Sequence, residues 1–305
     1  MTNPLKAVPI DLPKGICRSR TLPADELGLL WDSIILDQSL KDQLLSQAII
    51  NFTVRPKVSR AVLPLHGAVF LVGRPGTGKT SLAKGLAHRT AEVLKGLKFT
   101  LLEVDAHALG SSMMGKTQKA VSDLFSQSIA ESAMAGPTIV LLDEVETLAA
   151  NRSRLSLEAN PIDVHRATDA VLVQLDALAE KHQNLLFLAT SNFPQAVDSA
   201  FTSRCDLVVE IPMPDRSACE RILISCLRAL GATFSSIGHI ADMPEFSRVF
   251  DEVAGLDGRA LRKVVASALT IRKEVALDPQ RLALDDLIQA ARIAKTARIG
   301  ADNLR

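Results

Sequence analysis

The chain has 305 residues and a formal net charge of +1, which allows a sizeable core but gives no global field to attract nucleic acid or an anionic membrane. Its four cysteines form no Cys-x-x-Cys pair, so neither a zinc ribbon nor a disulfide framework is indicated, and we expect reduced thiols in a cytoplasmic protein. Prolines interrupt the N-terminal segment and no run of about 18 apolar residues occurs, so we expect neither a secretory leader nor a membrane span.

The N-terminal part predicts an arm followed by helices. Four prolines within residues 1–23 remove backbone donors and fix φ, which favours an extended arm without helix. From Leu27 to Ile49 apolar residues recur at helical spacing. Residues 24–66 are therefore expected to hold linker helices that lead into the main domain.

Short apolar runs then alternate with stretches of helical periodicity. The runs span 68–72, 99–104, 138–142, 185–189 and 207–211, and helices are predicted at 80–95, 116–134, 163–180 and around 194–202. This alternation predicts an α/β domain over 67–212, with a five-stranded parallel sheet wrapped by helices and nucleotide at the carboxyl ends of its strands. Helices predicted at 215–230, 245–254, 258–277 and 283–298 indicate a smaller helical lid domain over 213–305.

The motif GRPGTGKT, Gly73 to Thr80, follows the first strand of this domain and opens a helix. Its glycines allow backbone N–H groups to converge on phosphates at the positive end of that helix. Lys79 is predicted to bridge the β- and γ-phosphates of ATP, and Thr80 to bind Mg²⁺. The alternative, a chance glycine turn, is disfavoured by the strand and helix on either side. We assign nucleotide binding to Pro75, Gly76, Thr77, Gly78, Lys79, Thr80 and Ser81.

Two further strands end in polar residues that suit hydrolysis. Asp143 and Glu144 follow the third strand, where Asp143 is predicted to hold hydrated Mg²⁺ and Glu144 to orient and deprotonate the attacking water. Adjacent carboxylates at this place can instead cap the next helix. Asn192 follows the fourth strand and is predicted to contact the γ-phosphate or the water, although Asn is also common in such turns for local reasons.

Two arginines complete the candidate site. Arg204 lies just before the fifth strand, on the far side of the domain from the P-loop, which suits an arginine finger that reaches a neighbouring subunit's nucleotide. A surface salt bridge is the alternative. Arg259 begins a helix in the lid domain, where an anionic partner would offset its unfavourable position in the helix dipole; an exposed cap-region arginine is the alternative. Ile35 is assigned to nucleotide binding as well.

The loop LGSSMMGKTQKAV carries two adjacent methionines in a setting rich in Gly and Ser. Exposed Met113 and Met114 would offer a pliable grip on an extended peptide, whereas ordinary core filling is the alternative. The loop from Asn151 to Pro161, with Arg152 and Arg154, is a second candidate for lining a central channel.

In this order, the P-loop, the acidic pair, the strand-end Asn and the two arginines resemble an AAA+ ATPase. The segments LWDSIILDQSLKDQLL, LLDEVETLAANRSR, PIDVHRATDAVLVQLDAL, TSNFPQAVDSAFTSRCDL and GLDGRALRK are similar to the pachytene-checkpoint (thyroid-receptor-interactor) AAA+ proteins, which remodel HORMA-domain proteins. The resemblance covers about residues 22 to 298, and this combination is far more specific than the P-loop alone.

The resemblance implies a homo-hexamer that draws the N-terminal segment of a HORMA partner through its pore. Met113 and Met114 occupy the pore-loop positions, where the family usually carries an aromatic residue. A compact chain of this kind resembles the bacterial ATPases of CBASS anti-phage operons, which would dismantle a complex of a HORMA protein with a cGAS-like nucleotidyltransferase. The implied partners are therefore those two proteins, with no membrane and no direct reading of nucleic acid.

Two other functions remain as alternatives. A nucleic-acid motor or loader would fit many AAA+ rings, but the sequence offers no Lys/Arg cluster, aromatic stacking platform or helix-turn-helix signature. An ATP-dependent scaffold would bind the nucleotide without turnover, and the presence of Glu144 argues against that reading.

Overall fold

The computed structural model describes residues 12–13, 15–105, 117–149 and 161–302, and the chain divides into two compact units. The first unit takes in the chain up to Gly28, Gln43–Val72 and Ala83–Val209. The second takes in Leu29–Asp42, Gly73–Leu82 and the chain from Glu210 onward. The P-loop thus packs with the C-terminal helices, although more than a hundred residues of sequence separate them.

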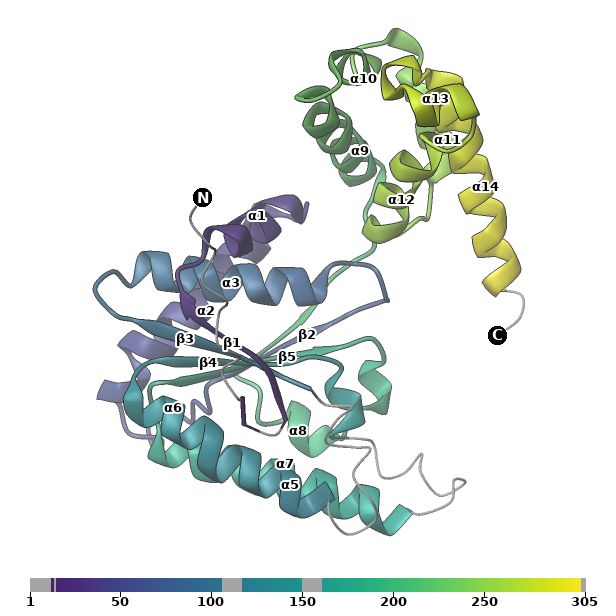
Figure 1. The fold of residues 1–305 in the computed structure, drawn as a ribbon. Helices are drawn as coiled ribbons and strands as arrows, with labels where there is room; N and C mark the ends of the chain where they lie inside the picture. Colours follow the sequence, from purple (N-terminus) through teal and green to yellow (C-terminus); the bar gives the residue numbers. More distant parts are fainter. Residues whose placement is uncertain (1–11, 14, 106–116, 150–160, 303–305) are drawn as a thin grey trace, which may run out of the picture. The chain divides into compact units, whose positions relative to one another are not determined.

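The first unit is built on one sheet, whose strand order among the described residues is β1-β3-β4-β5-β2-β6 (Figure 1). The strands are β1 (Ile16–Leu22), β2 (Ala68–Val72), β3 (Phe99–Val104), β4 (Thr138–Leu142), β5 (Leu185–Ser191) and β6 (Leu207–Glu210). β3 with β4, β4 with β5 and β5 with β2 pair in parallel. The predicted α/β class, a sheet wrapped by helices, is confirmed.

The sheet has one strand more than predicted. Part of the N-terminal arm forms β1, which pairs antiparallel with β3 from Ile16 opposite Val104 to Leu22 opposite Phe99. Only Ile16 and Leu22 of this strand are buried, and the residues between them do not alternate between buried and exposed. The period-2 pattern that marks a half-buried strand is therefore missing, which is why the sequence predicted no strand here.

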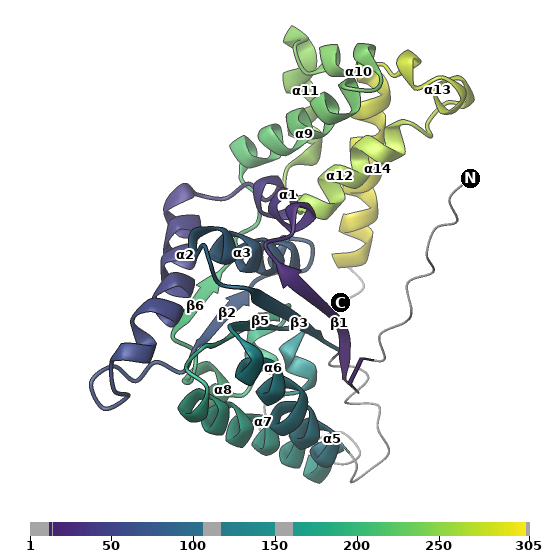
Figure 2. The same cartoon turned by 60° about the vertical axis from the view of Figure 1, so that its left-hand side comes forward.

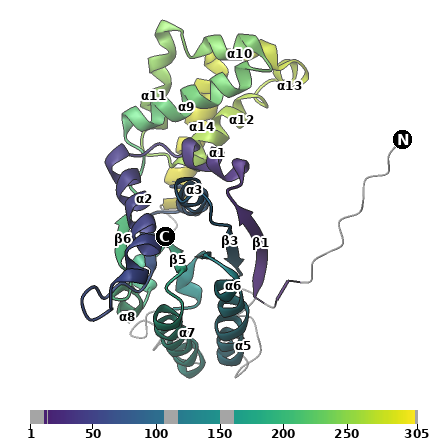
Figure 3. The ribbon, with the colours of Figure 1, turned by 90° about the vertical axis from the view of Figure 1, so that its left-hand side faces the viewer.

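Helices cover both faces of this sheet (Figures 1 and 3). Most of α2 and α3 lie on one face, and α5, α6 and α7 lie on the other, with α5 packed beside α7. A π-helical segment, Leu124–Ile129, joins α5 to α6. The helices of this part of the chain are α1 (Asp25–Ser33), α2 (Gln38–Thr53), α3 (Lys79–Val93), α5 (Thr117–Asp123), α6 (Ala130–Ala135), α7 (Pro161–Lys181) and α8 (Ser199–Thr202).

The core of the first unit explains the unbroken apolar runs. Every residue of β2, β4 and β5 is buried, as expected for parallel strands covered on both faces. Phe187 of β5 stacks on Phe125 at 6.0 Å between ring centroids, and Phe70 of β2 meets Phe201 edge to face at 5.6 Å. These contacts pack the middle of β5 and of β2 against the segments that hold Phe125 and Phe201.

The C-terminal helices of the second unit enclose a core of their own (Figure 2). They are α9 (Arg216–Gly231), α10 (Ser235–Ile240), α11 (Arg248–Val253), α12 (Gly258–Ala268), α13 (Lys273–Leu277) and α14 (Leu284–Asp302). The single helix predicted over 258–277 is two helices, because the chain becomes extended at Arg272, with φ −126° and ψ 141°. Within the described residues, none of the helices combines the length and the apolarity needed to cross a bilayer.

Candidate active site

The P-loop continues directly from β2 and runs into the first turn of α3. Gly76 and Gly78 have φ of 82° and 94°, values that L side chains rarely adopt. A Cβ at Gly76 would collide with the Asp257 carboxylate, and one at Gly78 would lie 2.5 Å from the Ile34 side chain. The motif therefore needs glycine at both positions for backbone conformation and for close packing within the second unit.

Lys79, the first residue of α3, is folded back onto this loop. Its ammonium group donates to the carbonyl oxygens of Gly73 and Arg74, both at 2.9 Å, and the side chain is buried. Thr77 donates its hydroxyl to the Arg74 carbonyl at 3.0 Å. The structure thus holds a buried cation against neutral acceptors at a helix N-terminus, a setting in which phosphate oxygens would bind favourably.

The remaining residues predicted for the nucleotide differ in exposure. Pro75 is exposed at the tip of the loop, whereas Thr80 and Ser81 are half-buried in the first turn of α3. Arg259 is the second residue of α12, and its side chain is exposed. Its backbone N–H donates to the Gly76 carbonyl at 3.2 Å. The structure therefore brings the main chain of Arg259 to the P-loop.

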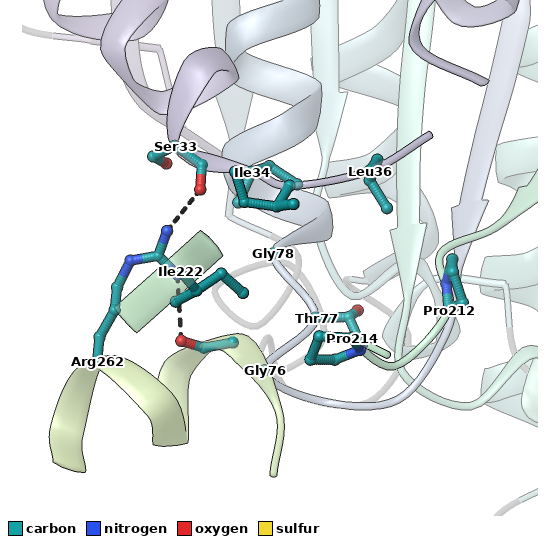
Figure 4. A pocket seen from close by; sticks show the side chains of 12 residues that line it. Ser33, Ile34, Leu36, Gly76, Thr77, Gly78, Pro212, Pro214, Ile222 and Arg262 are labelled. Carbon is teal, nitrogen blue, oxygen red and sulfur yellow. Dashed lines mark hydrogen bonds between the residues drawn. The ribbon is translucent and has the colours of Figure 1, made fainter. Parts of the chain in front are cut away.

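A pocket beside the P-loop was only partly visible in the sequence (Figure 4). Gly76, Thr77 and Gly78 form one side, and the predicted Ile35 is among the apolar lining residues Ile34, Ile35, Leu36, Pro212, Pro214 and Ile222. Such walls suit the flat face of an aromatic base.

Arg262 also lines this pocket and was missed by the sequence reasoning. It donates to the Ser33 carbonyl at 2.6 Å and to the Gly258 carbonyl at 3.1 Å (Figure 4). The guanidinium thereby links the last residue of α1 to the first residue of α12. Its spacing of three residues from Arg259, one helical turn, is the signal that would have pointed to it.

The acidic pair lies at the carboxyl ends of the strands in the first unit. Asp143 and Glu144 directly follow β4, and Glu144 has φ of 53°, the one positive φ of a non-glycine residue in the described part of the chain. The hydroxyl of Thr190, on β5, donates to the Asp143 carboxylate at 2.5 Å and accepts the Glu144 backbone N–H at 3.2 Å. One buried hydroxyl therefore contacts both acidic residues.

Asn192 lies beside Glu144. Its side-chain amide donates to the Glu144 carboxylate at 3.0 Å, and its backbone N–H donates to the Glu146 carboxylate at 3.2 Å. Thr190 and Glu146 were missed by the sequence reasoning. Because side chains two apart on a strand share a face, the position of Thr190 relative to Asn192 was the available signal.

A cavity of about 190 Å³ adjoins these acids within the first unit. It is lined by Asp143 and Glu144 together with Cys17 of β1, Lys84 of α3 and Glu103 of β3. The Lys84 ammonium pairs with the Glu103 carboxylate at 2.6 Å. Cys17 is exposed, but partial desolvation of its thiol, reinforced by the charges of Glu103 and Asp105, raises the thiol pKa and keeps it protonated near neutral pH. The space is large enough for several water molecules next to Glu144.

Arg204 lies near the opposite ends of the strands, at the amino edge of the same sheet, whereas the acids lie at its carboxyl edge. Its guanidinium binds both carboxylate oxygens of Asp176 on α7 at 2.7–3.0 Å and donates to the Ala200 carbonyl at 2.7 Å. This hydrogen-bonded pairing lowers the pKa of Asp176. The structure therefore contains the salt bridge that was the alternative for Arg204. Nearby, the Asp206 carboxylate accepts the backbone N–H groups of His66, Gly67 and Ala68 at 2.7–3.1 Å.

The separation of the two edges follows from the strand register. Asp206 donates its backbone N–H to Ala68, the first residue of β2, whereas Val72, its last residue, pairs with Ser191. Five strand residues span about 13 Å at a rise of about 3.3 Å per residue. Arg204 is thus remote from Glu144 within one chain. Met113, Met114, Arg152 and Arg154 lie outside the described residues.

A model of the ATPase family associated with various cellular activities (AAA) matches residues 69–213. CD-NTase-associated protein 6 of Pseudomonas aeruginosa is 66% identical over 288 residues, which cover 94% of this chain and 95% of that protein. The pachytene checkpoint protein 2 homolog of Rattus norvegicus is 33% identical over 277 residues, which cover 82% of this chain and 64% of that protein.

Solved structures share the fold. The structure of C. elegans PCH-2 matches with a TM-score of 0.74 at 26% identity, covering 94% of this chain and 77% of that one. A chain of the E. coli MS115-1 HORMA:CdnC:Trip13 complex matches with a TM-score of 0.72, covering 90% of this chain and 94% of that one. At 18% identity, this second likeness shows the fold alone.

Proposed function

Because this chain belongs to the AAA ATPase family, in the group that includes CD-NTase-associated protein 6 and the pachytene checkpoint proteins, we propose that it hydrolyses ATP to drive the remodelling of a protein partner. The observation that supports catalysis best is the acidic edge of the sheet. There, Glu144 is held by Asn192 through its side chain and by Thr190 through its backbone. A carboxylate fixed in this way is suited to orient and deprotonate an attacking water.

The nucleotide-binding roles follow from chemistry of the P-loop. The Lys79 ammonium exchanges the carbonyl oxygens of Gly73 and Arg74 for the β- and γ-phosphate oxygens of ATP. The backbone N–H groups from Gly76 to Ser81 surround the phosphates at the positive end of α3. Ile35 and its apolar neighbours receive the base, and the Arg259 side chain senses the phosphates.

The donor set fits Mg²⁺. Thr80 offers a hydroxyl and Asp143 a carboxylate, which are the hard oxygen ligands that this ion prefers. Mg²⁺ held there would offset the negative charge of the transferring phosphate.

Arg204 acts on the nucleotide of an adjoining copy in a homo-hexamer. Its place at the edge of the sheet remote from Glu144 supports action across a subunit boundary. Its bidentate hydrogen bonding to Asp176 supports this role, because a guanidinium group binds phosphate oxygens in the same forked way. Hydrolysis then depends on assembly, because the transition-state charge is stabilised by a neighbour.

The remodelled partner is a HORMA-domain protein together with its cGAS-like nucleotidyltransferase. Support comes from the relatives: one is named a CD-NTase-associated protein, and one structural match is a chain of a HORMA:CdnC:Trip13 complex. Met113 and Met114 grip an extended segment of the HORMA protein in the pore. By dismantling the complex, the ATPase down-regulates an anti-phage signal.

The decisive experiment uses the Glu144→Gln variant as a substrate trap. With ATP and Mg²⁺, this variant is expected to retain the HORMA–nucleotidyltransferase complex on an affinity column, whereas wild type releases the two proteins. Wild-type protein that hydrolyses ATP but leaves the complex intact under all nucleotide conditions would refute the remodelling step. Salt-dependent stimulation by single-stranded DNA would instead favour the nucleic-acid motor.

A further inference from the structure

Thr190 stands out because its hydroxyl faces both acidic residues of the candidate active site. It is fully buried near the end of β5, with 1% of its surface exposed. The five residues that precede it in the strand, Leu185 to Ala189, are all apolar. Valine has nearly the same shape and would suit a parallel strand covered on both faces equally well. The hydroxyl therefore has a purpose other than packing.

The two hydrogen bonds of this hydroxyl have fixed directions. An ionised carboxylate is an acceptor only, so the Thr190 O–H must donate to Asp143 Oδ1, at 2.5 Å. The Glu144 N–H must donate, so the Thr190 oxygen accepts it, at 3.2 Å. A single oriented hydroxyl thus sets the rotation of the Asp143 carboxylate and anchors the backbone of Glu144 in its left-handed conformation.

Asn192, the residue that follows β5, complements this arrangement. Its amide reaches the side chain of Glu144, whereas Thr190 reaches the side chain of Asp143. The strand end thereby supplies one neutral donor for each acid. A hydroxyl or amide donor orients a carboxylate oxygen without adding a positive charge of its own.

We propose that Thr190 is a positioning residue, which aims the Asp143 carboxylate at Mg²⁺ and holds Glu144 at the angle required for activating water. This inference rests on the proposed ATP hydrolysis and deepens it. The hydroxyl acts through Asp143 and Glu144, which are its two hydrogen-bond partners. Partners of this kind, behind a metal ligand, typically change metal affinity or activity by about 10- to 100-fold when they are removed.

The test compares Thr190→Val, which keeps the shape and removes the hydroxyl, with Thr190→Ser, which keeps the hydroxyl. Thr138→Val is the matched control, because Thr138 is equally buried at the start of neighbouring β4 and donates to the Gly136 carbonyl, away from the acids. Metal binding is read directly by titrating Mn²⁺ into protein with a non-hydrolysable ATP analogue and following free Mn²⁺ by electron paramagnetic resonance. Nucleotide binding in EDTA, the unfolding temperature and phosphate release are measured alongside.

Thr190→Val is expected to weaken Mn²⁺ binding about 10- to 100-fold and to lower kcat by a similar factor, with nucleotide binding in EDTA unchanged. Thr190→Ser and Thr138→Val are expected to bind Mn²⁺ like wild type. Equal Mn²⁺ affinity for Thr190→Val and wild type overturns the inference. If Thr190→Val does not fold, Thr190→Ala against Thr190→Ser gives the same comparison. Failure of the proposed function is distinct, since wild type itself would then release no phosphate.

Discussion

In the first unit, charged side chains at the carboxyl ends and at the amino ends of the strands have different kinds of hydrogen-bond partner. At the carboxyl edge, Asp143 and Glu144 receive hydrogen bonds from the neutral side chains of Thr190 and Asn192. At the amino edge, the cation of Arg204 is matched by the anion of Asp176 in a bidentate pair. A neutral donor orients a carboxylate without bringing a positive charge to it. In an ion pair, the opposite charges of the two partners offset each other.

This difference suits two different tasks. In the proposed function, the acids of the carboxyl edge would serve the metal ion and the water molecule of their own chain. Arg204 at the amino edge would exchange Asp176 for a more highly charged anion, the triphosphate of a neighbouring chain. The comparison predicts that mutations at the carboxyl edge act within one chain and that loss of Arg204 acts on the adjacent chain.

The largest expected effect tests this claim about the amino edge. Arg204→Ala should lower the ATPase rate of the assembled protein by about 10³ to 10⁵, because a lost arginine finger leaves transition-state charge without its partner. Nucleotide binding, measured by fluorescence of a labelled ATP, should stay at the wild-type level. Arg204→Lys is the control, and it should recover little activity, since an ammonium group cannot bind in the same bidentate way.

Mixing variants separates action within a chain from action between chains. Arg204→Ala mixed with Glu144→Gln should regain activity, because some interfaces then combine an intact Glu144 in one subunit with an intact Arg204 in its neighbour. A mixture as inactive as either variant alone, in assemblies shown by mass measurement to be mixed, would contradict the division of labour between the two edges.

The next effect belongs to the carboxyl edge. Glu144→Gln should lower the rate of phosphate release by about 10² to 10⁴, the usual contribution of a general base. The glutamine oxygen can still accept the Asn192 amide, so folding and ATP binding should persist. Glu146→Gln is the matched control two residues along the same loop, where an amide oxygen can keep the hydrogen bond from the Asn192 backbone. Equal losses in both variants would show that the loop as a whole, and not the carboxylate of Glu144, carries the effect.

Much of the carboxyl edge could be predicted from the sequence, because buried strands and the polar residues that follow them are visible as local patterns. The unbroken apolar runs gave the bounds of β2, β3 and β4, and the acids after β4 were expected beside Asn192, where the structure has Glu144. The fully covered faces of these strands are what make such runs readable. The roles of these residues stay predictions.

The remaining features depend on contacts between distant segments, which periodicity does not encode. The partner of Arg204 is Asp176, 28 residues earlier on another helix. Arg262 meets the Ser33 carbonyl across 229 residues of sequence. β1 was missed because its pairing with β3, and not an apolar pattern, makes it a strand. The helix predicted over 258–277 ignored the extended conformation at Arg272.

A smaller effect concerns the scaffold of the amino edge. Asp206→Ala should lower the free energy of unfolding by about 1–3 kcal/mol, because three backbone N–H groups at the start of β2 lose a charged acceptor. Chemical denaturation followed by circular dichroism measures this. Asp242→Ala is the control, because that carboxylate is 64% exposed and lies 3.7 Å from its partner Arg228, which is too far for a hydrogen bond. Similar losses of unfolding free energy for both variants would show that the hydrogen bonds to Asp206 add no more stability than an exposed carboxylate does.

The smallest effect probes the ion pair itself. Asp176 is 40% exposed, so Asp176→Asn should cost only about 0.2–1 kcal/mol of stability at pH 7. Because Arg204 lowers the pKa of Asp176, this stabilisation is fully present above the unfolded carboxyl pKa of about 3.9 and is lost as pH falls through the lower folded value. His66, 3.8 Å from Asp176, has its pKa lowered by burial and stays neutral at pH 7, so the ion pair that Asp176→Asn removes at this pH is the one with Arg204. Denaturation of wild type and of Asp176→Asn should show a difference in unfolding free energy at pH 7 that closes only in acid. The ATPase rate of the Asp176→Asn assembly should stay near that of wild type.

An ATPase loss as large as that of Arg204→Ala would mean that Asp176 and Arg204 act together during hydrolysis. The pair would then not be a resting state that Arg204 leaves.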